Sequence, residues 1–223
     1  MDDPDADLRM LERTYERFHL INSVVSRWRA VYRRDIRPRA RRRAIRILDV
    51  GAGGGDVSRA LAEWSRRDGL EVEVTALDAD ARADRWARSR GGGVEYRCAY
   101  TSELVDAGAT FDIVISNHLL HHLSDDELTA LLRESAALVP DGGLVMHRDI
   151  ARSRLAYLGF AAGTLPFARN LLAGSFIRAD GLTSIRRAYT PAELAAVVPS
   201  DWQVRTAFPA RLELRYEVPD AGS

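Results

Sequence analysis

The feature that most constrains the fold is the decapeptide ILDVGAGGGD at residues 47–56. The apolar run over residues 45–50 predicts a buried strand, and the glycines after it predict a tight turn that leads into a helix at residues 57–67. A glycine turn at the carboxyl end of the first strand is the usual ligand crevice of an open α/β sheet. The decapeptide therefore predicts an α/β protein that holds a nucleotide-like ligand at this turn.

The same strand–helix alternation continues along the chain and then changes near its end. Strands are predicted at residues 45–50, 72–77, 94–99, 111–116, 144–150, 202–208 and 212–218. The last two alternate in polarity and are separated by a short Pro-Ala turn, so they indicate an antiparallel pair. The pattern predicts a Rossmann-like, seven-stranded, mostly parallel sheet with an antiparallel edge pair and helices on both faces.

The composition excludes several classes of function. All 32 basic residues are arginine, so lysine-bound pyridoxal enzymes and P-loop proteins are excluded. The single cysteine, Cys98, excludes an internal disulfide and a cysteine zinc cluster, and we expect it to be a small buried residue on a strand. The net charge is zero, which gives no reason to expect nucleic acid as a partner. No segment reads as a signal peptide or a membrane span, so a cytoplasmic protein is the expectation.

The region before the first predicted strand divides into two parts. Residues 9–32 carry apolar side chains at steps of three and four, which predicts helices, and Pro38 is expected to end this region. Residues 37–46 contain six arginines and no acid. We interpret them as a solvated linker, with contact to an anionic surface or an acidic partner as the alternative.

The glycine turn departs from the dinucleotide fingerprint in a way that points to its ligand. The last position of G-x-G-x-x-G is Asp56, and Asp49 lies two residues before Gly51. A carboxylate there would repel a pyrophosphate and attract a cation. Asp78, at the end of the second strand, stands where ribose hydroxyls should lie. S-adenosylmethionine fits, because it joins a nucleoside to two cationic groups and carries no phosphate.

Four motifs then occur in the order of a known family. ILDVGAGGGD, ALDAD, FDIVISNHLLHHL and LVPDGGLVM together resemble the class I S-adenosylmethionine-dependent methyltransferases, over roughly residues 45–150. The resemblance implies that the glycine turn and Asp49 hold the methionine half and that Asp78 holds the ribose. The family usually has an aspartate at the end of the third strand, where this chain has Tyr100, so Tyr100 or Cys98 is expected against the adenine. The predicted cofactor contacts are Asp49, Gly51, Ala52, Gly53, Asp78, Ala79, Tyr100, Asn117 and Leu119.

The catalytic candidates follow the fourth and fifth strands. His118, His121 and His122 share one face of a helical turn, and a histidine near its ordinary pKa is a suitable base for a phenol. Asp149 lies at the carboxyl edge of the fifth strand, where it can orient a histidine. The alternatives are core or capping histidines and an arginine ion pair for Asp149. This stretch also resembles ubiquinone O-methyltransferases, which have Glu and Glu-His there and are associated with a divalent metal; the carboxylates are absent here, and we predict no metal.

The acceptor site is predicted from the flanking segments. YERFHLINSVVSRW resembles the lid of small-molecule methyltransferases of the quinone-biosynthesis group, and LAYLGFAAGTLPFARNLL stands where that group inserts acceptor-binding helices. We therefore expect residues 1–44 to be a helical lid and an Arg-rich linker. Residues 45–223 are expected to be the methyltransferase domain, with a helical insert at about 152–188. The predicted substrate contacts are Tyr15, His19, His147 and Tyr189.

The predicted function is methyl transfer to a small lipophilic aromatic acceptor, at the hydroxyl of a phenol, hydroquinone or polyketide-like compound. Carbon methylation of a similar ring stays open, because both reactions need the phenol deprotonated. An RNA or protein methyltransferase is a weaker alternative, since Asn117 is followed by His-Leu-Leu rather than Pro-Pro-Tyr/Phe. A non-methylating protein that binds the cofactor is a further alternative. The oligomeric state, monomer or homodimer, stays open.

Overall fold

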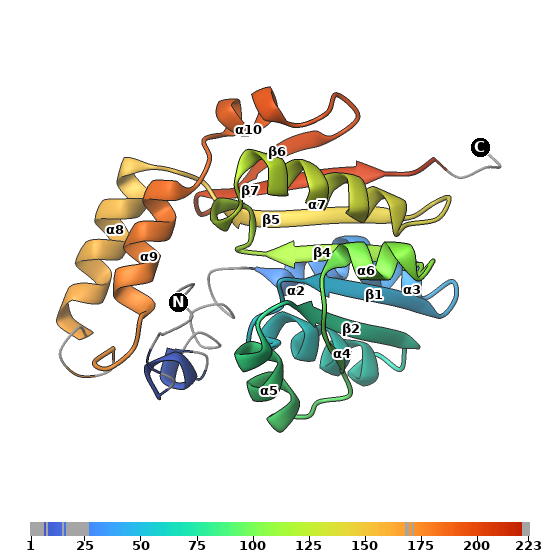
Figure 1. Cartoon of the computed structure of the whole chain (residues 1–223), viewed down its shortest axis with the longest axis horizontal. Helices are drawn as coiled ribbons and strands as arrows, with labels where there is room; N and C mark the ends of the chain where they lie inside the picture. Colours follow the sequence, from blue (N-terminus) through green and yellow to red (C-terminus); the bar gives the residue numbers. More distant parts are fainter. Residues whose placement is uncertain are drawn as a thin grey trace.

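The computed structural model describes residues 7, 9–14, 16, 27–167, 170 and 172–219. Its centre is one seven-stranded sheet of order β3-β2-β1-β4-β5-β7-β6, in which only β7 runs antiparallel to its neighbours (Figure 1). The strands are β1 Ile45–Val50, β2 Val72–Asp78, β3 Glu95–Cys98, β4 Ile113–Asn117, β5 Leu144–Ile150, β6 Gln203–Ala207 and β7 Arg211–Glu217. The predicted fold class is confirmed. Strand order reverses between β1 and β4, which places a ligand crevice at their carboxyl ends.

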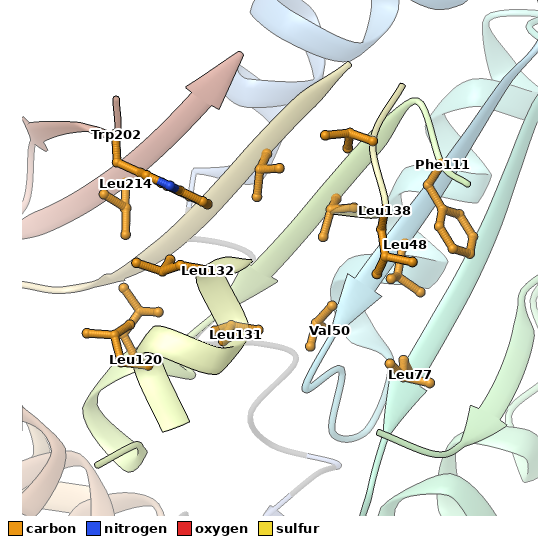
Figure 2. Close-up of a cluster of buried hydrophobic side chains, with 14 of the residues drawn as sticks. Leu48, Val50, Leu77, Phe111, Leu120, Leu131, Leu132, Leu138, Trp202 and Leu214 are labelled. Atoms are coloured by element: carbon orange, nitrogen blue, oxygen red, sulfur yellow. The ribbon is translucent and has the colours of Figure 1, made fainter. Parts of the chain in front are cut away.

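One face of the sheet is covered by α6 (Thr101–Asp106), α7 (Asp125–Ala137) and α10 (Pro191–Val197). Leucines of these helices pack on the sheet together with Trp202 and Leu214, as Figure 2 shows for Leu131 and Leu132 of α7. Ser124 and Thr190 begin α7 and α10 with capping boxes, because each side chain accepts from the third helical N–H while a glutamate there accepts from the cap residue. This layer fixes the start of α7, just after the histidine cluster.

The other face is covered by α4 (Asp56–Arg67), α5 (Ala81–Ser89) and a helical run over residues 28–40. The run consists of α2 (Trp28–Val31), a π-helical turn (Tyr32–Ile36) and α3 (Arg37–Ala40). The prediction that Pro38 ends the helical region is wrong: Pro38 lies in the first turn of α3, where its missing N–H costs no hydrogen bond.

The arginine run is only partly the solvated linker that the sequence predicts. Its first four residues form α3, in which Ala40 is buried. Its guanidinium groups pair with acids from distant parts of the chain: Arg37 with Asp68, and Arg39 with Glu217. These ion pairs connect the helical layer to the end of α4 and to β7.

The last two long helices, α8 (Arg154–Thr164) and α9 (Ile177–Arg187), form a hairpin beyond the carboxyl ends of β4 and β5 (Figure 1). Helix α8 has no buried residue, and Leu155 and Leu158 on its outer side are exposed. The N-terminal helical segment at residues 9–14 contacts both α5 and Phe176, the residue before α9. Leu11 packs between α5 and Phe176, and the backbone N–H of Phe176 donates to Thr14. Among the described residues, no helix has the length and apolarity needed to cross a bilayer.

Candidate active site

A cavity of about 420 Å³ lies at the carboxyl edge of the sheet and joins three groups of residues. The glycine turn after β1 forms one end. The segment after β4, with Asn117 and the three histidines, forms the middle. Side chains of α8 and α9, with the turn before β7, form the other end. These residues are Asp49, Gly51–Gly54, Asp56, Val57, Asn117, His118, His121, His122, Ile150, Ala151, Ala156, Gly159, Phe160, Ile177, Asp180, Gly181, Ser184, Ile185 and Pro209–Arg211.

The glycine turn has a backbone that side chains would obstruct. Gly51 and Gly53 both adopt positive φ, at +64° and +53°, a region that glycine enters without strain. A Cβ at Gly51 would lie 2.9 Å from a methyl carbon of Leu119, so this leucine packs directly over the turn. Beside Gly53 there is open space within 4 Å. The turn is thus a narrow backbone cradle facing the cavity, and Leu119 supports it from behind rather than lining the cavity.

Asp49 places a buried carboxyl group at the floor of this cradle. Its side chain is 1% exposed and accepts a hydrogen bond of 2.6 Å from the hydroxyl of Ser58 on α4. Burial raises the pKa of Asp49 to about 7; the Ser58 hydrogen bond lowers it, and repulsion from Asp78 raises it further. A desolvated carboxylate on a cavity wall, with no cation of the described chain paired to it, fits a positively charged ligand group.

Asp78 holds the cradle rather than lining the cavity. Its two carboxylate oxygens accept from the backbone N–H groups of Gly53, at 2.7 Å, and Asp80, at 2.9 Å. Burial raises its pKa, although these hydrogen bonds oppose the shift. Asp80, not Asp78, caps α5. Each carboxylate oxygen can accept a second hydrogen bond, so Asp78 keeps capacity for a ligand hydroxyl.

The residues predicted against the adenine lie outside the cavity lining. Tyr100 is 68% exposed and caps α6. Cys98 is exposed at the end of β3, with its Sγ 3.7 Å from the carbonyl oxygen of Ala79, so the expectation of a buried cysteine is wrong. Residue 98 is the last of a short strand at the sheet edge, where no helix covers its side chain. Ala79, Cys98 and Tyr100 form an open shelf next to Asp78.

His118, the residue after β4, has an unfavourable backbone conformation that a hydrogen bond to β5 holds in place. It adopts φ +62°, uncommon for a residue with a side chain, while its N–H donates to the carbonyl of Arg148 on β5. Nη1 of Arg211 on β7 donates to its Nε2 at 2.8 Å. Burial and the Arg211 charge lower the pKa of His118 to about 3. His118 is therefore a neutral hydrogen-bond acceptor for Arg211 at neutral pH, and a poor base.

His121 forms a buried dyad with Asp149. Its Nδ1 lies 2.8 and 2.9 Å from the two carboxylate oxygens, and its backbone N–H donates to the same group at 2.9 Å. Burial raises the pKa of Asp149, but the hydrogen bonds from His121 and Ile150 outweigh it, and the pKa lies below its ordinary value. The ionised carboxylate fixes the proton on Nδ1, which leaves the lone pair on Nε2. That Nε2 is buried and has no hydrogen-bond partner among the described residues, and His121 is one of the residues that line the cavity.

His122 completes the cluster but does not share the dyad. It is exposed, and its ring lies 4.2 Å from that of His121, centre to centre. All three predicted histidines line the same cavity. Within the described ranges, no three His, Cys, Asp or Glu side chains are grouped as a metal site.

Two predicted substrate contacts lie elsewhere. His147 is 0% exposed, with Nδ1 2.8 Å from the Ser116 hydroxyl and its ring stacked on Trp202. It does share a sheet face with Asp149, as predicted, but that face is covered there by the core. Tyr189 packs against the same core, and burial with a hydrogen bond to Asp125 raises its pKa. Neither side chain lines the cavity, so the structure does not bring these two predicted contacts to the site. Tyr15 and His19 lie outside the described residues.

Comparison with known families gives the assignment. A family model described as a methyltransferase domain matches residues 24–189. The chain belongs to this methyltransferase domain family. The membership confirms the predicted class of S-adenosylmethionine-dependent methyltransferases, which the four sequence motifs also indicate.

Relatives of this methyltransferase with curated names share about half of the chain. The ubiquinone biosynthesis O-methyltransferase of Rhizobium leguminosarum bv. trifolii (strain WSM2304) is 34% identical over 116 residues, 50% of this chain and 43% of that protein. The protein of the same name from Parvibaculum lavamentivorans (strain DS-1) is 30% identical over 129 residues, 55% of this chain and 49% of that one. The chain thus spans less than half the length of these relatives.

Solved structures share the fold of this methyltransferase at low sequence identity. The plantazolicin methyltransferase BpumL, solved in complex with SAH, has a TM-score of 0.59 at 12% identity, covering 98% of this chain and 91% of that one. Magnesium protoporphyrin IX methyltransferase from Synechocystis PCC 6803, also with SAH, has a TM-score of 0.52 at 15% identity, covering 93% and 83%. These similarities support the fold of the methyltransferase over nearly its whole length.

Sequence reasoning missed two polar groups of the methyltransferase site. Ser58 lies nine residues after Asp49 on the buried side of α4, and a serine among helical apolar positions carries no signal of its own. Arg211 begins a strand whose charged residues alternate, a pattern typical of a solvent-facing row. Both roles depend on which distant element covers the residue.

Substitution of Gly51 by alanine should damage the cradle more than a glycine substitution elsewhere. Both the positive φ and the 2.9 Å approach to Leu119 oppose a Cβ there. Gly108→Ala is the matched control, because Gly108 has φ +63° and open space around its Cβ position. We expect Gly51→Ala to lower the free energy of unfolding by about 1–3 kcal/mol and Gly108→Ala by about 1 kcal/mol. Chemical denaturation measures both; equal losses would contradict the close approach.

Proposed function

We propose that this methyltransferase transfers a methyl group to the hydroxyl of a small, lipophilic, phenol-type acceptor, with His121 as the general base. The observation that carries the proposal is the buried Asp149–His121 dyad. Nε2 of His121 has no hydrogen-bond partner among the described residues, and His121 lines the same cavity as the glycine turn. One cavity thus joins a cradle for the donor with a base for the acceptor.

On the donor side, this chain offers a carboxylate and a backbone cradle. Asp49 would face the positive charge of the methionine half, the Gly51–Gly54 turn would enclose it, and Asp78 would accept from ribose hydroxyls while holding the turn. Bound S-adenosylmethionine supplies a methyl group on a sulfonium, which is open to in-line attack by an oxygen nucleophile. Methyl transfer needs the two reacting atoms at about 3 Å, and the shared cavity restricts both ligands to one small volume.

On the acceptor side, His121 takes the proton of the hydroxyl at Nε2. Asp149 keeps the opposite nitrogen protonated and stabilises the imidazolium that forms, since its lowered pKa keeps it ionised. A phenol is the acceptor that suits this base, because its oxygen becomes strongly nucleophilic once the proton is removed. His118 does not serve, because Arg211 occupies its Nε2.

The character of the acceptor follows from the α8–α9 end of the cavity. Ala156, Phe160, Ile177 and Ile185 contribute apolar surface there, which suits a lipophilic ring. The curated relatives, named ubiquinone biosynthesis O-methyltransferases, support a phenolic acceptor. Carbon methylation of the same type of ring remains the second candidate, because deprotonation by His121 would activate the ring as well as its oxygen.

The test is a turnover assay with identification of the product. The protein is incubated with methyl-labelled S-adenosylmethionine and a panel of phenols, quinols and resorcinols, and S-adenosylhomocysteine is followed by chromatography. We expect turnover with lipophilic phenols and a labelled methoxy signal in the NMR spectrum of the product. A labelled aryl-methyl carbon would favour the second candidate. Cofactor binding without turnover of any phenol would contradict the proposed acceptor class.

A further inference from the structure

Arg211 brings a buried positive charge to the acceptor half of the cavity. It is the first residue of β7 and pairs in register with Ile150, the last residue of β5. Both residues line the cavity, and Arg211 is 2% exposed. The carbonyl of the preceding Ala210 accepts from the N–H of Ala151, so the backbone at Arg211 is held by hydrogen bonds to the end of β5.

Its guanidinium lacks the partners that a buried arginine needs. Among the described residues it forms one hydrogen bond, from Nη1 to Nε2 of His118, and its Nε is buried with no acceptor. No carboxylate of the described residues forms an ion pair with it. Arg148, its neighbour on the same sheet face, is paired with Glu213 and repels it.

The charge nevertheless persists under ordinary conditions. Burial, with repulsion from Arg148, lowers the pKa of Arg211 to about 10, so the group is protonated at neutral pH. Asp149 attracts it through space, but both oxygens of Asp149 accept hydrogen bonds from His121. A buried cation with donors left over is costly unless an anion completes the site.

We propose that Arg211 binds a carboxylate carried by the acceptor, so that the substrate class is an aromatic hydroxy acid rather than a neutral phenol. This inference rests on the proposed function, because it names the acceptor of that same site. A guanidinium presents its N–H groups in one plane and matches the two oxygens of a carboxylate. Nη1 contacts His118, whose ring centre lies 6.3 Å from that of His121. Arg211 and His121 thus both neighbour His118 and line the same cavity, which is why we assign the carboxylate and the hydroxyl to one acceptor.

The test measures binding, so it does not depend on turnover. A hydroxybenzoate and the matching hydroxybenzamide are titrated calorimetrically into the full chain saturated with S-adenosylhomocysteine. We expect the wild type to bind the carboxylate roughly tenfold or more tightly than the amide, as charge-assisted hydrogen bonds imply. In Arg211→Gln this preference should disappear, and in Arg211→Lys it should be reduced but still present, because the charge remains without the planar fork.

Arg186→Gln is the matched control. Arg186 is an exposed arginine of α9 that donates to Tyr157 and does not line the cavity, so its loss should leave the carboxylate preference intact. Equal affinity of the wild type for the two ligands, or no binding of either, would overturn the inference without any variant. So would an Arg211→Gln protein, shown folded by thermal melting, that weakens both ligands alike. If the carboxylate binds through Arg211 but no phenol is methylated, the proposed function fails, and the carboxylate site at Arg211 stands without its role in acceptor recognition. If neutral phenols are methylated and carboxylates are not preferred, the proposed function stands and this inference fails.

Discussion

His121→Gln should lower kcat for a phenolic acceptor by roughly 100- to 10,000-fold, the range that a positioned general base contributes. Glutamine can still donate to Asp149, but it has no lone pair of useful basicity where Nε2 stands. Cofactor affinity should stay within about twofold, since His121 acts at the acceptor's end of the cavity. Steady-state kinetics with a phenol found by the turnover assay, together with calorimetry of S-adenosylhomocysteine, measure the two quantities.

The pH profile separates a base from a structural histidine. A phenol ionises in solution near pH 10, so the deficit of His121→Gln should shrink as the pH approaches that value. A deficit that stays constant with pH would contradict the base role. His147→Gln is the matched control: this histidine is also buried and is bonded to Ser116, but it does not line the cavity. It should lower thermal stability while kcat changes little.

Asp49→Asn should weaken cofactor binding by about 2–5 kcal/mol, a loss of roughly 30-fold to several thousandfold in affinity, because a buried carboxylate that faces a cation loses its charge. The wild type should show a related pH effect. Since the pKa of Asp49 is raised to about 7 in the free protein, the carboxyl is protonated below that pH. Affinity for S-adenosylmethionine should therefore fall as the pH drops through 7, and binding near pH 7 should release a proton. Calorimetry in buffers of different ionisation enthalpy detects that proton.

The same substitution should stabilise the free protein at pH 8. The folded-state pKa of Asp49 lies above its unfolded value of 3.8, because burial favours the neutral carboxyl group. The folded state is therefore most stable relative to the unfolded state below pH 3.8, and this stability is lost as the pH rises through about 7 and the buried group ionises. At pH 8 the ionised, buried carboxylate costs on the order of 4 kcal/mol as an upper bound, at about 1.4 kcal/mol per pKa unit. Asparagine removes that cost and still accepts from Ser58. A melting temperature at pH 8 that is lower than that of the wild type would contradict this account.

The sheet and the donor cradle could be predicted from the sequence because their signals are local. A strand, its glycine turn and the helix after it lie within residues 45–67, and the four motifs occur in a fixed order. The helical layer at residues 28–40 was misjudged for the opposite reason. Pro38 and the arginines look like the end of a structured region, whereas the layer depends on acids more than 30 positions away, such as Asp68 and Glu217.

The choice among the three histidines could not be made from the sequence at all. They are one and three residues apart, yet one accepts from Arg211, one pairs with Asp149 and one is exposed. The difference arises from the positive φ of His118 and from two strands that arrive 28 and 93 residues later in the chain. A motif can place a cluster at the right edge of the sheet, but roles within it depend on long-range packing.

The single cavity that joins the glycine turn to the α8–α9 hairpin also limits the kinetics. In the proposed reaction donor and acceptor share this space, so the methyl group passes directly from the sulfonium to the acceptor oxygen. Both ligands must be present together, so initial-rate plots should intersect rather than run parallel.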